Sequence, residues 1–278
     1  MGILYSYNQG GINCTRTLDE HYNDEYFNMH AHERIEVIFF ISGYCRYYVE
    51  GNEYALKPYD VMIMRPSETH RLKVMGDVPY ERIVFHIIPD TFKMFDPKGE
   101  LLKPFFDRPL GKMNKFSSED FDTDLYKLCL ESIDFSTGLN NKIEIESKLL
   151  TVLTEISKAY HNRMTNFGKQ DKSENNEIIS KIIEYINQNI FEPLSLNAIC
   201  EHFFISQSQL NRIFKKATGS SVWEYISIKR LLSARKMIRA GEPAGQACIK
   251  CGFKDYSSFY RMYKSRFGVS PKQDDLRR

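Results

Sequence analysis

The stretch from Ser206 to Gly219 constrains this chain most, because it has the signals of one short helix with both ends marked. Ser206 and Gln209 form an S-x-x-Q capping box, in which each side chain pairs with a backbone amide of the first turn. Gly219 stands where a helix ends in a left-handed residue. One face is apolar, with Leu210, Ile213, Phe214 and Ala217. A second amphipathic segment and a two-residue turn precede it, which predicts a helix-turn-helix. That segment carries Leu196, Ile199, Cys200 and Phe203.

The same pattern recurs 49 residues later, from Asp255 to Gly268. The matched pairs are Leu210 and Phe259, Arg212 and Arg261, Phe214 and Tyr263, Lys215 and Lys264, and Gly219 and Gly268. Two copies in register are a far stronger signal than one. Between them, a capping box at Ser221 and Glu224 and a stop at Gly241 predict a helix over Val222–Ala240. A helix of this length, about 28 Å, could set the second helices of the two helix-turn-helix motifs roughly one duplex turn apart on DNA.

Polar and basic side chains occupy the faces opposite the apolar stripes, as DNA recognition requires. We expect base-edge contacts from the hydroxyl, amide, phenol and guanidinium groups, and phosphate contacts from the lysines. Charge agrees, because residues 1–168 hold 19 Lys and Arg against 25 Asp and Glu, whereas residues 169–278 hold 19 against 11. The predicted DNA-binding residues are Gln207, Ser208, Asn211, Arg212, Lys215, Lys216, Tyr256, Ser257, Tyr260, Arg261 and Lys264.

The segment Leu194–Pro271 resembles the DNA-binding domain of the AraC/XylS family of bacterial transcription regulators. The matching positions are Leu194, Ser195, Leu196, Ser206, Leu210, Arg212, Phe214, Lys215, Gly219, Tyr225, Ile226, Arg230, Ala234, Gly252, Phe253, Ser257, Phe259, Arg261, Gly268, Ser270 and Pro271. Cys200 and Cys248 replace the small alanines of the family pattern. Asp274-Asp275 replaces the usual Tyr-Arg. The resemblance implies double-stranded DNA, a small-molecule effector, a second copy of the chain and RNA polymerase as partners, with no cofactor.

The length of 278 residues predicts two domains, and the composition is ordinary for a globular protein. No apolar run approaches 18 residues and the N-terminus has no basic-then-apolar signal, so we predict a cytoplasmic protein without membrane partners. The six cysteines are scattered, which argues against a disulfide framework. Cys248 and Cys251 form one CxxC without a second pair of ligands, so helix packing is favoured over zinc or redox chemistry.

Residues 29–88 have a different sequence pattern, in which short apolar runs are separated by turn residues. Residues 1–28 have few regular signals, and we expect an arm or an edge strand there. We therefore predict an α+β, two-domain protein. Its N-terminal domain is a cupin-like jelly-roll β-barrel with flanking helices, and its C-terminal domain is all-α with two helix-turn-helix motifs. The expected strands are Ile35–Ser42, Tyr44–Glu50, Glu53–Leu56, Val61–Arg65, Arg71–Val74 and Glu81–Ile88.

A cluster of histidines and a carboxylate falls in these strands. The pattern resembles the cupin motifs, whose four ligand positions would be His30, His32, Glu36 and His70, although Tyr59 stands where the second motif opens with glycine. Three interpretations stay open: a divalent metal site at those four residues, a site for a polar effector such as a sugar, or polar residues of structural use. We favour the effector. The effector-binding set would be His30, His32, Glu36, Arg46, Tyr48, His70, Arg82 and His86.

Two short helical turns follow, at Phe92–Phe95 and Leu101–Phe106. Two longer helices come next, one from Ser118 and one over Asn141–Tyr160. The apolar stripe of the second helix could pack on the barrel or form the dimer contact. Polar residues then form a linker, so the predicted parts are 1–163 for effector binding and dimerisation, 164–176 for the linker and 177–278 for DNA. We predict a DNA-binding regulator, an activator by resemblance, with no catalytic residue. The alternative is a metal-binding cupin enzyme or metal sensor fused to a DNA-binding domain.

Overall fold

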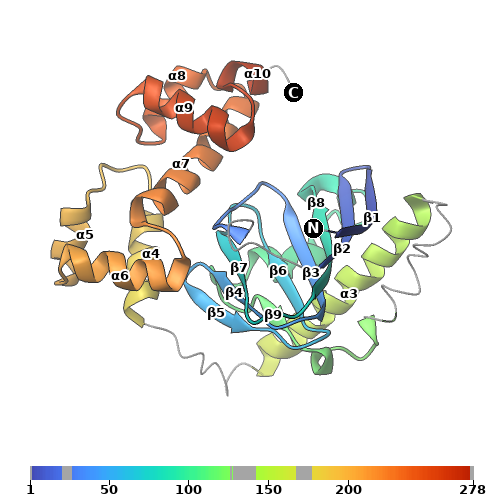
Figure 1. The fold of residues 1–278 in the computed structure, drawn as a ribbon. Coiled ribbons are helices and arrows are strands. Elements are labelled where there is room, and N and C mark those ends of the chain that lie inside the picture. Colours follow the sequence, from blue (N-terminus) through green and yellow to red (C-terminus); the bar gives the residue numbers. More distant parts are fainter. Residues whose placement is uncertain (1, 21–26, 126, 128–141, 167–176, 276–278) are drawn as a thin grey trace. The chain divides into compact units, whose positions relative to one another are not determined.

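The structure is a computed structural model, and it describes residues 2–20, 27–125, 127, 142–166 and 177–275 of the 278. The chain divides into two compact units. The first comprises Met1–Asn28 and Glu33–Glu174, and the second comprises Met29–His32 and Asn175–Arg278. Figure 1 follows the chain from blue through green to red, and the two units are described in turn.

Two antiparallel sheets form the first unit. The larger sheet has the order β1-β2-β8-β3-β6-β9 and the smaller has the order β5-β4-β7 (Figure 1). Each strand expected between residues 35 and 88 is confirmed, with ends within one residue of the prediction. The strands are β1 (Gly2–Gln9), β2 (Ile12–Asp19), β3 (Ile35–Ser42), β4 (Cys45–Val49), β5 (Asn52–Ala55), β6 (Val61–Met64), β7 (His70–Val74), β8 (Tyr80–Ile87) and β9 (Lys115–Phe116).

Residues 2–19 are more regular than expected, because β1 and β2 form a hairpin that extends the larger sheet. β1 is an edge strand, as one of the two predictions for this region had it. β2 is an internal strand and pairs with β8 over its whole length, from Ile12 opposite Ile87 to Asp19 opposite Tyr80. The apolar side chains of β2 are few and spaced by polar residues, so the strand pattern is weak in the sequence.

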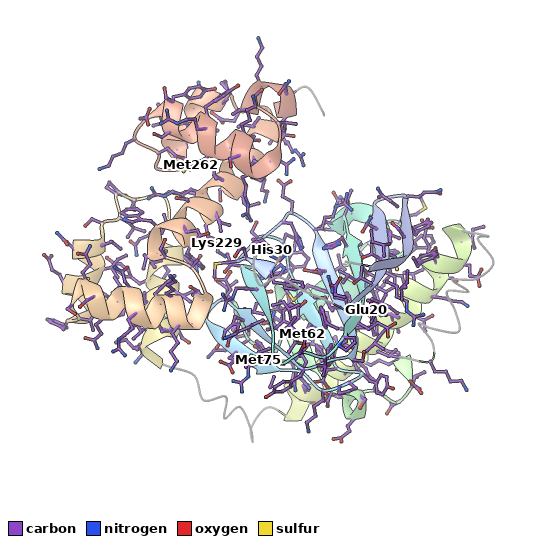
Figure 2. The ribbon with its side chains drawn as sticks, viewed as in Figure 1. Glu20, His30, Met62, Met75, Lys229 and Met262 are labelled. Atoms are coloured by element: carbon purple, nitrogen blue, oxygen red, sulfur yellow. The ribbon has the colours of Figure 1, made fainter. Side chains whose placement is uncertain are left out.

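The larger sheet is buried on both faces, which explains why β3 is a continuous apolar run. On one face, Val37 and Phe39 pack in a cluster with residues of the helix α3 (Lys142–Asn166). On the other face, Ile38 and Phe40 pack with residues of the smaller sheet, as does Met62, which Figure 2 labels. The smaller sheet is thus stacked on the larger one with an apolar layer between them.

The two sheets do not close into a continuous barrel, so the jelly-roll expectation holds for the layers and not for closure. β1 and β9 end the larger sheet, and β5 and β7 end the smaller one. Tyr59, at the position where the cupin motif has glycine, adopts a left-handed φ of +74°. A tyrosine there takes the conformation that glycine adopts without steric cost.

The helices of the first unit differ in part from the prediction. Ser118 starts only the short turn η4 (Ser118–Asp120), not a long helix, and most of that predicted helix lies outside the described residues. The helix predicted over Asn141–Tyr160 is confirmed as α3. Its stripe is buried against the larger sheet, so this face cannot also be a dimer contact. The stripe comprises Ile145, Leu149, Val152, Leu153 and Ile156, which are buried, and Leu150, which is partly buried. The short turns are η2 (Pro89–Phe92), η3 (Glu100–Leu102) and α1 (Lys103–Phe106).

The second unit is helical and contains both predicted helix-turn-helix motifs. Its helices are α4 (Glu177–Gln188), α5 (Leu196–Phe203), α6 (Gln207–Thr218), α7 (Val222–Arg239), α8 (Ala244–Lys250), α9 (Tyr256–Phe267) and α10 (Pro271–Asp275). Helix α7 joins two apolar clusters, one shared with α4, α5 and α6 and the other shared with α8 and α9. Along its length Lys229, labelled in Figure 2, is buried with its amine 5.4 Å from the centre of the Tyr225 ring.

The segment Met29–His32 belongs to this unit. Met29 and Ala31 are buried in the same apolar cluster as α6 and α7. The hydroxyl of Ser220 lies 3.1 Å from the Met29 sulfur, and Arg266 donates a hydrogen bond of 3.2 Å to the Ala31 carbonyl. Nothing in the sequence pattern marks residues 29–32 as part of the helical domain.

Asp274 explains one departure from the family pattern. The side chain is fully buried and accepts hydrogen bonds from Arg235, Arg239 and Tyr263, at 2.6, 2.8 and 2.9 Å. It therefore ties the C-terminal helix α10 to α7 and α9. Burial acts to raise the pKa of Asp274, but the bonds from the two arginines and the tyrosine outweigh it and hold that pKa below its usual range.

The CxxC pair is part of the apolar core around α8. Cys248 and Cys251 are both buried in the cluster that α7, α8 and α9 share. Burial raises the pKa of Cys251 to about 11, and it also raises the pKa of Cys248. Both thiols are therefore held in the protonated form, which is the poorer metal ligand and nucleophile. Among the described helices, none is both long enough and apolar enough to span a membrane.

Candidate functional site

Helix α6 has the ends that the sequence predicts. The hydroxyl of Ser206 accepts a hydrogen bond from the Gln209 amide at 3.2 Å, and Gly219 ends the helix with a φ of +80°. Leu210 and Phe214 are fully buried. The six side chains of α6 that were predicted to contact DNA are all exposed: Gln207, Ser208, Asn211, Arg212, Lys215 and Lys216. The helix thus presents one polar and basic face to solvent.

Helix α9 repeats this construction. Asp255 caps it by accepting hydrogen bonds from the amides of Ser257 and Ser258 at 2.9 and 3.0 Å, and Gly268 ends it with a φ of +71°. Phe259 and Tyr263 are buried. The five predicted side chains are exposed here too: Tyr256, Ser257, Tyr260, Arg261 and Lys264.

Arg230 on α7 links the two motifs, a role that sequence reasoning missed although its position matched the family pattern. Its guanidinium donates three hydrogen bonds of 2.7 Å, to the carbonyls of Ile190, Glu192 and Gly252. The first two carbonyls follow α4, and the third lies in the turn between α8 and α9. One side chain therefore fixes the second helix-turn-helix against the chain that leads into the first. Burial lowers the pKa of Arg230, although an arginine stays charged at neutral pH.

A polar cluster lies between the two sheets of the first unit. Glu36 on β3 and His86 on β8 face each other across paired strands, and His70 reaches them from β7. The Nε2 atoms of His70 and His86 lie 2.9 and 3.4 Å from the two oxygens of the Glu36 carboxylate. Glu36 and His70 are buried, at 5% and 1% exposure. The structure thus brings together three of the predicted effector residues.

The geometry fixes the protons on His70. Its Nδ1 lies 2.9 Å from the backbone oxygen of Glu68, which can only accept, so Nδ1 carries a proton. In the neutral imidazole, Nε2 would then present its lone pair to the Glu36 carboxylate. Burial acts to lower the pKa of His70, but the charge of Glu36 and the two hydrogen bonds raise it above its usual value. The site therefore favours a positive charge, carried by a proton or another cation, beside Glu36.

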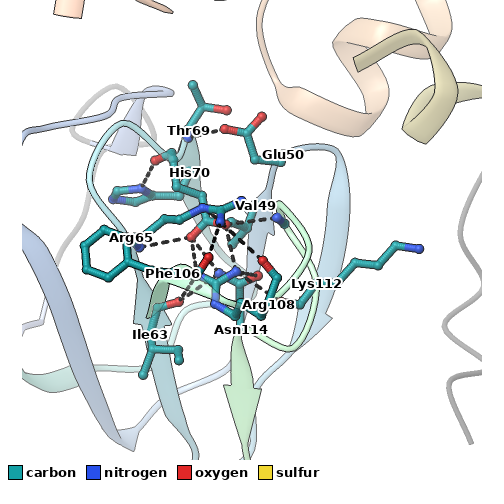
Figure 3. Close-up of polar contacts among 12 residues, drawn as sticks. Val49, Glu50, Ile63, Arg65, Thr69, His70, Phe106, Arg108, Lys112 and Asn114 are labelled. Carbon is teal, nitrogen blue, oxygen red and sulfur yellow. Dashed lines mark hydrogen bonds and ion pairs between the residues drawn. The ribbon is translucent and has the colours of Figure 1, made fainter. Parts of the chain in front are cut away.

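Glu68 is itself held by a buried network, shown in Figure 3. Arg108, fully buried, forms a two-fold ion pair with both carboxylate oxygens of Glu68, at 2.8 and 2.5 Å. Asn114 and the Gly111 amide donate to the same carboxylate at 3.0 and 2.9 Å. These bonds fix the backbone before β7, so they orient the imidazole of His70. Nothing in the sequence pattern pairs Glu68 with Arg108.

Arg82 precedes His86 by four residues on β8. It faces the same layer and forms a 2.8 Å ion pair with Asp19, while its guanidinium lies 4.5 Å from the centre of the Tyr80 ring. The hydroxyl groups of Tyr80 and Tyr47 are 3.5 Å apart. Asp19, Tyr47 and Tyr80 line this interior and were not predicted. The alternation of β4 was a signal for Tyr47, because Cys45 and Val49 share its face.

The structure does not bring Arg46 and Tyr48 to this cluster. Both lie on the other face of β4 from Tyr47 and are only partly buried. Arg46 forms an ion pair with Glu53 on β5, and Tyr48 lies under the guanidinium of Arg71, at 5.3 Å. The period of two along a strand explains this, since an interior Tyr47 forces its two neighbours outward.

His30 and His32 lie on the segment that belongs to the second unit, with their ring centres 6.1 Å apart. The predicted four-ligand set thus combines residues of both units, and it stays a prediction. Within the first unit, Glu36, His70 and His86 supply one carboxylate and two imidazoles.

Together, the two units define a class of protein: a helical domain with two helix-turn-helix motifs follows a two-sheet domain that has a polar interior. Comparison with known proteins agrees with that description. The family model described as an AraC-like ligand binding domain matches residues 15–153, and the one described as a helix-turn-helix domain matches residues 199–275. The chain belongs to the AraC family of DNA-binding transcription regulators.

Individual relatives cover different parts of the chain. The HTH-type transcriptional activator RhaS of Escherichia fergusonii is 21% identical over 256 residues, which is 89% of this chain and 87% of RhaS. The multiple antibiotic resistance protein MarA of Salmonella typhimurium is 33% identical over 94 residues, 34% of this chain and 74% of MarA. Among solved structures, ToxT of Vibrio cholerae covers 96% of this chain and 98% of its own, at 14% identity and a TM-score of 0.41.

Proposed function

We propose that the first unit binds a small polar effector, such as a sugar, between its two sheets, and that binding changes how this regulator engages DNA. The single observation that carries the proposal is the cluster of Glu36, His70 and His86 within an otherwise apolar layer. Polar groups that converge in an apolar interior suit the binding of hydroxyl groups, because carboxylate and imidazole can accept and donate hydrogen bonds. The family relationship supports a ligand in this domain.

Arg82, Asp19, Tyr47 and Tyr80 would contact the same effector from farther along the layer. Aromatic rings beside charged hydrogen-bonding groups suit a sugar, which has both apolar and hydroxylated surfaces. The effector would act by shifting the population of chains that can bind adjacent DNA sites.

A thermal-shift screen of sugars and related polar metabolites tests the effector proposal, since a ligand stabilises the state that it binds. The stabilisation should be lost in Glu36→Gln and kept in Glu53→Gln, because Glu53 pairs with Arg46 on the outer face of the sheet. Equal loss in both variants, or a response that neither variant changes, would contradict the assignment of the site.

A divalent metal ion at the same cluster is the second candidate, favoured by one specific observation. Two imidazole nitrogens lie 2.9 and 3.4 Å from different oxygens of one carboxylate, and His70 already donates its other nitrogen to a backbone carbonyl, as metal-bound histidines do. Elemental analysis of protein purified without an affinity tag separates the two candidates. About one equivalent of zinc, iron or manganese per chain would favour a metal sensor or metallo-enzyme over the effector.

We propose further that α6 and α9 read DNA. Ser208, Asn211 and Arg212 on α6 would contact base edges, and Lys215, Lys216 and Lys264 would contact phosphates. Arg212→Ala should weaken binding to the specific site by about 1–3 kcal/mol and relax sequence preference. Lys216→Ala is the matched control, because loss of a phosphate contact weakens specific and random DNA alike. If Arg212→Ala also weakens binding to specific and random DNA equally, Arg212 is a phosphate contact.

We also propose a homodimer formed within the region from Ser118 to Tyr160. Because the apolar stripe of α3 is used inside the unit, the contact would involve the first turn of its outer face, around Ile143, which is 74% exposed and about two turns away from Thr151. Light scattering on the full chain should show a dimer that Ile143→Glu disrupts and Thr151→Glu, another exposed position of α3, leaves intact. A monomeric native chain at tens of micromolar, roughly the concentration at which weak interfaces still form, would refute the dimer.

Activation would require contact with RNA polymerase at a promoter, and we propose this role because RhaS is a transcriptional activator. Run-off transcription from a promoter that carries the selected site measures it. Increased transcript on addition of protein supports activation, whereas decreased transcript supports repression.

A further inference from the structure

The two recognition helices, α6 and α9, allow a position-by-position comparison. Both carry a serine, an arginine and a lysine at matched exposed positions: Ser208 and Ser257, Arg212 and Arg261, and Lys215 and Lys264. Among the matched positions predicted to contact DNA in both helices, they differ at two. Gln207 of α6 is matched by Tyr256 of α9, and Asn211 is matched by Tyr260. One helix therefore carries two amides where the other carries two phenol rings.

The amides and the rings are suited to different bases. An asparagine or glutamine can form two hydrogen bonds with the N6 and N7 edge of adenine, while the shared arginine suits guanine. A tyrosine cannot form that pair of bonds with adenine. Its ring offers apolar surface, and the apolar group in the major groove is the C5-methyl of thymine.

The rings on α9 are placed to act together. Tyr256 and Tyr260 are 46% and 37% exposed, and their ring centres are 6.4 Å apart. Tyr256 also packs against the buried Phe259, with ring centres 5.7 Å apart, so it is anchored to the core of the domain. Rings that are anchored at one end lose little conformational freedom when the other end binds.

We propose that Tyr256 and Tyr260 read thymine methyl groups, so that the two half-sites are read through different atoms of their A·T base pairs. One half-site, under α6, is then specified through adenine and guanine, and the other, under α9, through thymine and guanine. This inference rests on the proposed reading of DNA by α6 and α9, and it adds the bases that distinguish the two half-sites. The competing role for the tyrosines is a hydrogen bond from each hydroxyl to a phosphate, which carries no sequence information.

Analogue bases separate these roles. The full-length protein first selects its site from random duplex DNA. Each thymine of the selected site is then replaced by deoxyuridine, which lacks only the methyl group, and each adenine by 7-deazaadenine, which lacks N7. Deoxyuridine should weaken binding about fourfold per contacted methyl, the affinity equivalent of burying one methyl group. We expect this loss in one half-site and the loss from 7-deazaadenine in the other.

Variants assign the half-sites to the helices. Tyr260→Phe keeps the ring and should keep the sensitivity to deoxyuridine. Tyr260→Asn installs the side chain found at the matched position of α6 and should abolish that sensitivity at one thymine. Asn211→Ala is the matched control and should abolish only the sensitivity to 7-deazaadenine. Tyr260 is exposed, so these changes leave the core of the domain intact.

Three results overturn the inference. In the first, deoxyuridine has no effect on binding in either half-site. In the second, the effect of deoxyuridine persists unchanged in Tyr260→Asn. In the third, Tyr260→Phe loses as much affinity as Tyr260→Asn on thymine-containing DNA. The last result assigns the tyrosine to a phosphate. Failure to select any sequence is a different result, because it removes the proposed DNA reading itself.

Discussion

Replacing Gly252 by alanine tests how tightly Arg230 holds the two helix-turn-helix motifs. Gly252 lies in the turn after α8 with a φ of +77°, a region that disfavours side chains. A methyl group there would lie 2.9 Å from Cζ of Arg230 and 2.9 Å from the carbonyl oxygen of Phe191. Both distances are too short, so Arg230 or the backbone has to move.

The expected cost has two parts. The left-handed conformation alone costs alanine about 1–2 kcal/mol. Displacing the guanidinium of Arg230 breaks at least one of its three 2.7 Å hydrogen bonds, and a bond from a charged group contributes about 1.5–3 kcal/mol. Gly252→Ala should therefore lower the free energy of unfolding of the helical domain by about 2.5–5 kcal/mol.

Urea denaturation of the full chain measures this through Trp223, the single tryptophan, which lies on α7. Gly268→Ala is the matched control, because Gly268 has a similar φ of +71° but a methyl group there meets no atom within 4 Å. The control should lose only the conformational part. Equal losses in the two variants would refute the tight packing of Arg230 against Gly252.

Four further predictions concern stability. Phe204 is 95% exposed with a left-handed φ of +53°, so Phe204→Gly should stabilise the helical domain by about 0.5–1 kcal/mol in the same urea assay, whereas Phe204→Ala should give no gain. Asp274→Asn should destabilise that domain by about 2–3 kcal/mol, because it leaves two arginines without their carboxylate. The control Glu242→Gln, at an exposed ion pair, should cost less than about 0.5 kcal/mol. Comparable losses in the two variants would contradict the stabilising role of the buried Asp274 carboxylate. Because the folded pKa of Asp274 is lowered, its contribution should be present above the ordinary Asp pKa of about 3.9 and should be lost as the pH falls through the folded value. The pKa of His70 is raised, so its contribution should be complete below about pH 6.5 and should be lost as the pH rises through the folded value. Hydrogen exchange of β7 amides should show this loss in the native chain, and its persistence in His70→Gln would assign it to another group.

Much of the fold was predictable because its signals are local. The strands from Ile35 to Ile87 were placed within one residue by turn residues and short apolar runs. An arm or an edge strand was predicted where β1 and β2 form a hairpin, because the buried side chains of these strands are few. The helix expected from Ser118 is wrong in its first residues, where Ser117 and Asp120 cap only a short turn.

The residues of the candidate sites were likewise predictable where their placement depends on nearby sequence. The exposed faces of α6 and α9 follow directly from helical spacing, since burying Leu210 and Phe259 turns the polar residues outward. Only some residues of the interior cluster were predicted from the sequence. Glu36 and His86 were recognised by type, but Tyr47 was missed while its two neighbours on β4 were chosen, because the buried face of a strand depends on the sheet that packs against it.

Local residue patterns specify the two helix-turn-helix motifs, because caps, left-handed glycines and apolar stripes act over a few residues and need no distant partner. The pairing of groups that are far apart in the chain is set by how the folded chain packs. The bonds of Arg230 to carbonyls 40 and 22 residues away, the ion pair of Glu68 with Arg108, and the burial of Met29 and Ala31 in the helical unit leave no local pattern. Such contacts depend on which surfaces pack together, and packing is a property of the whole fold.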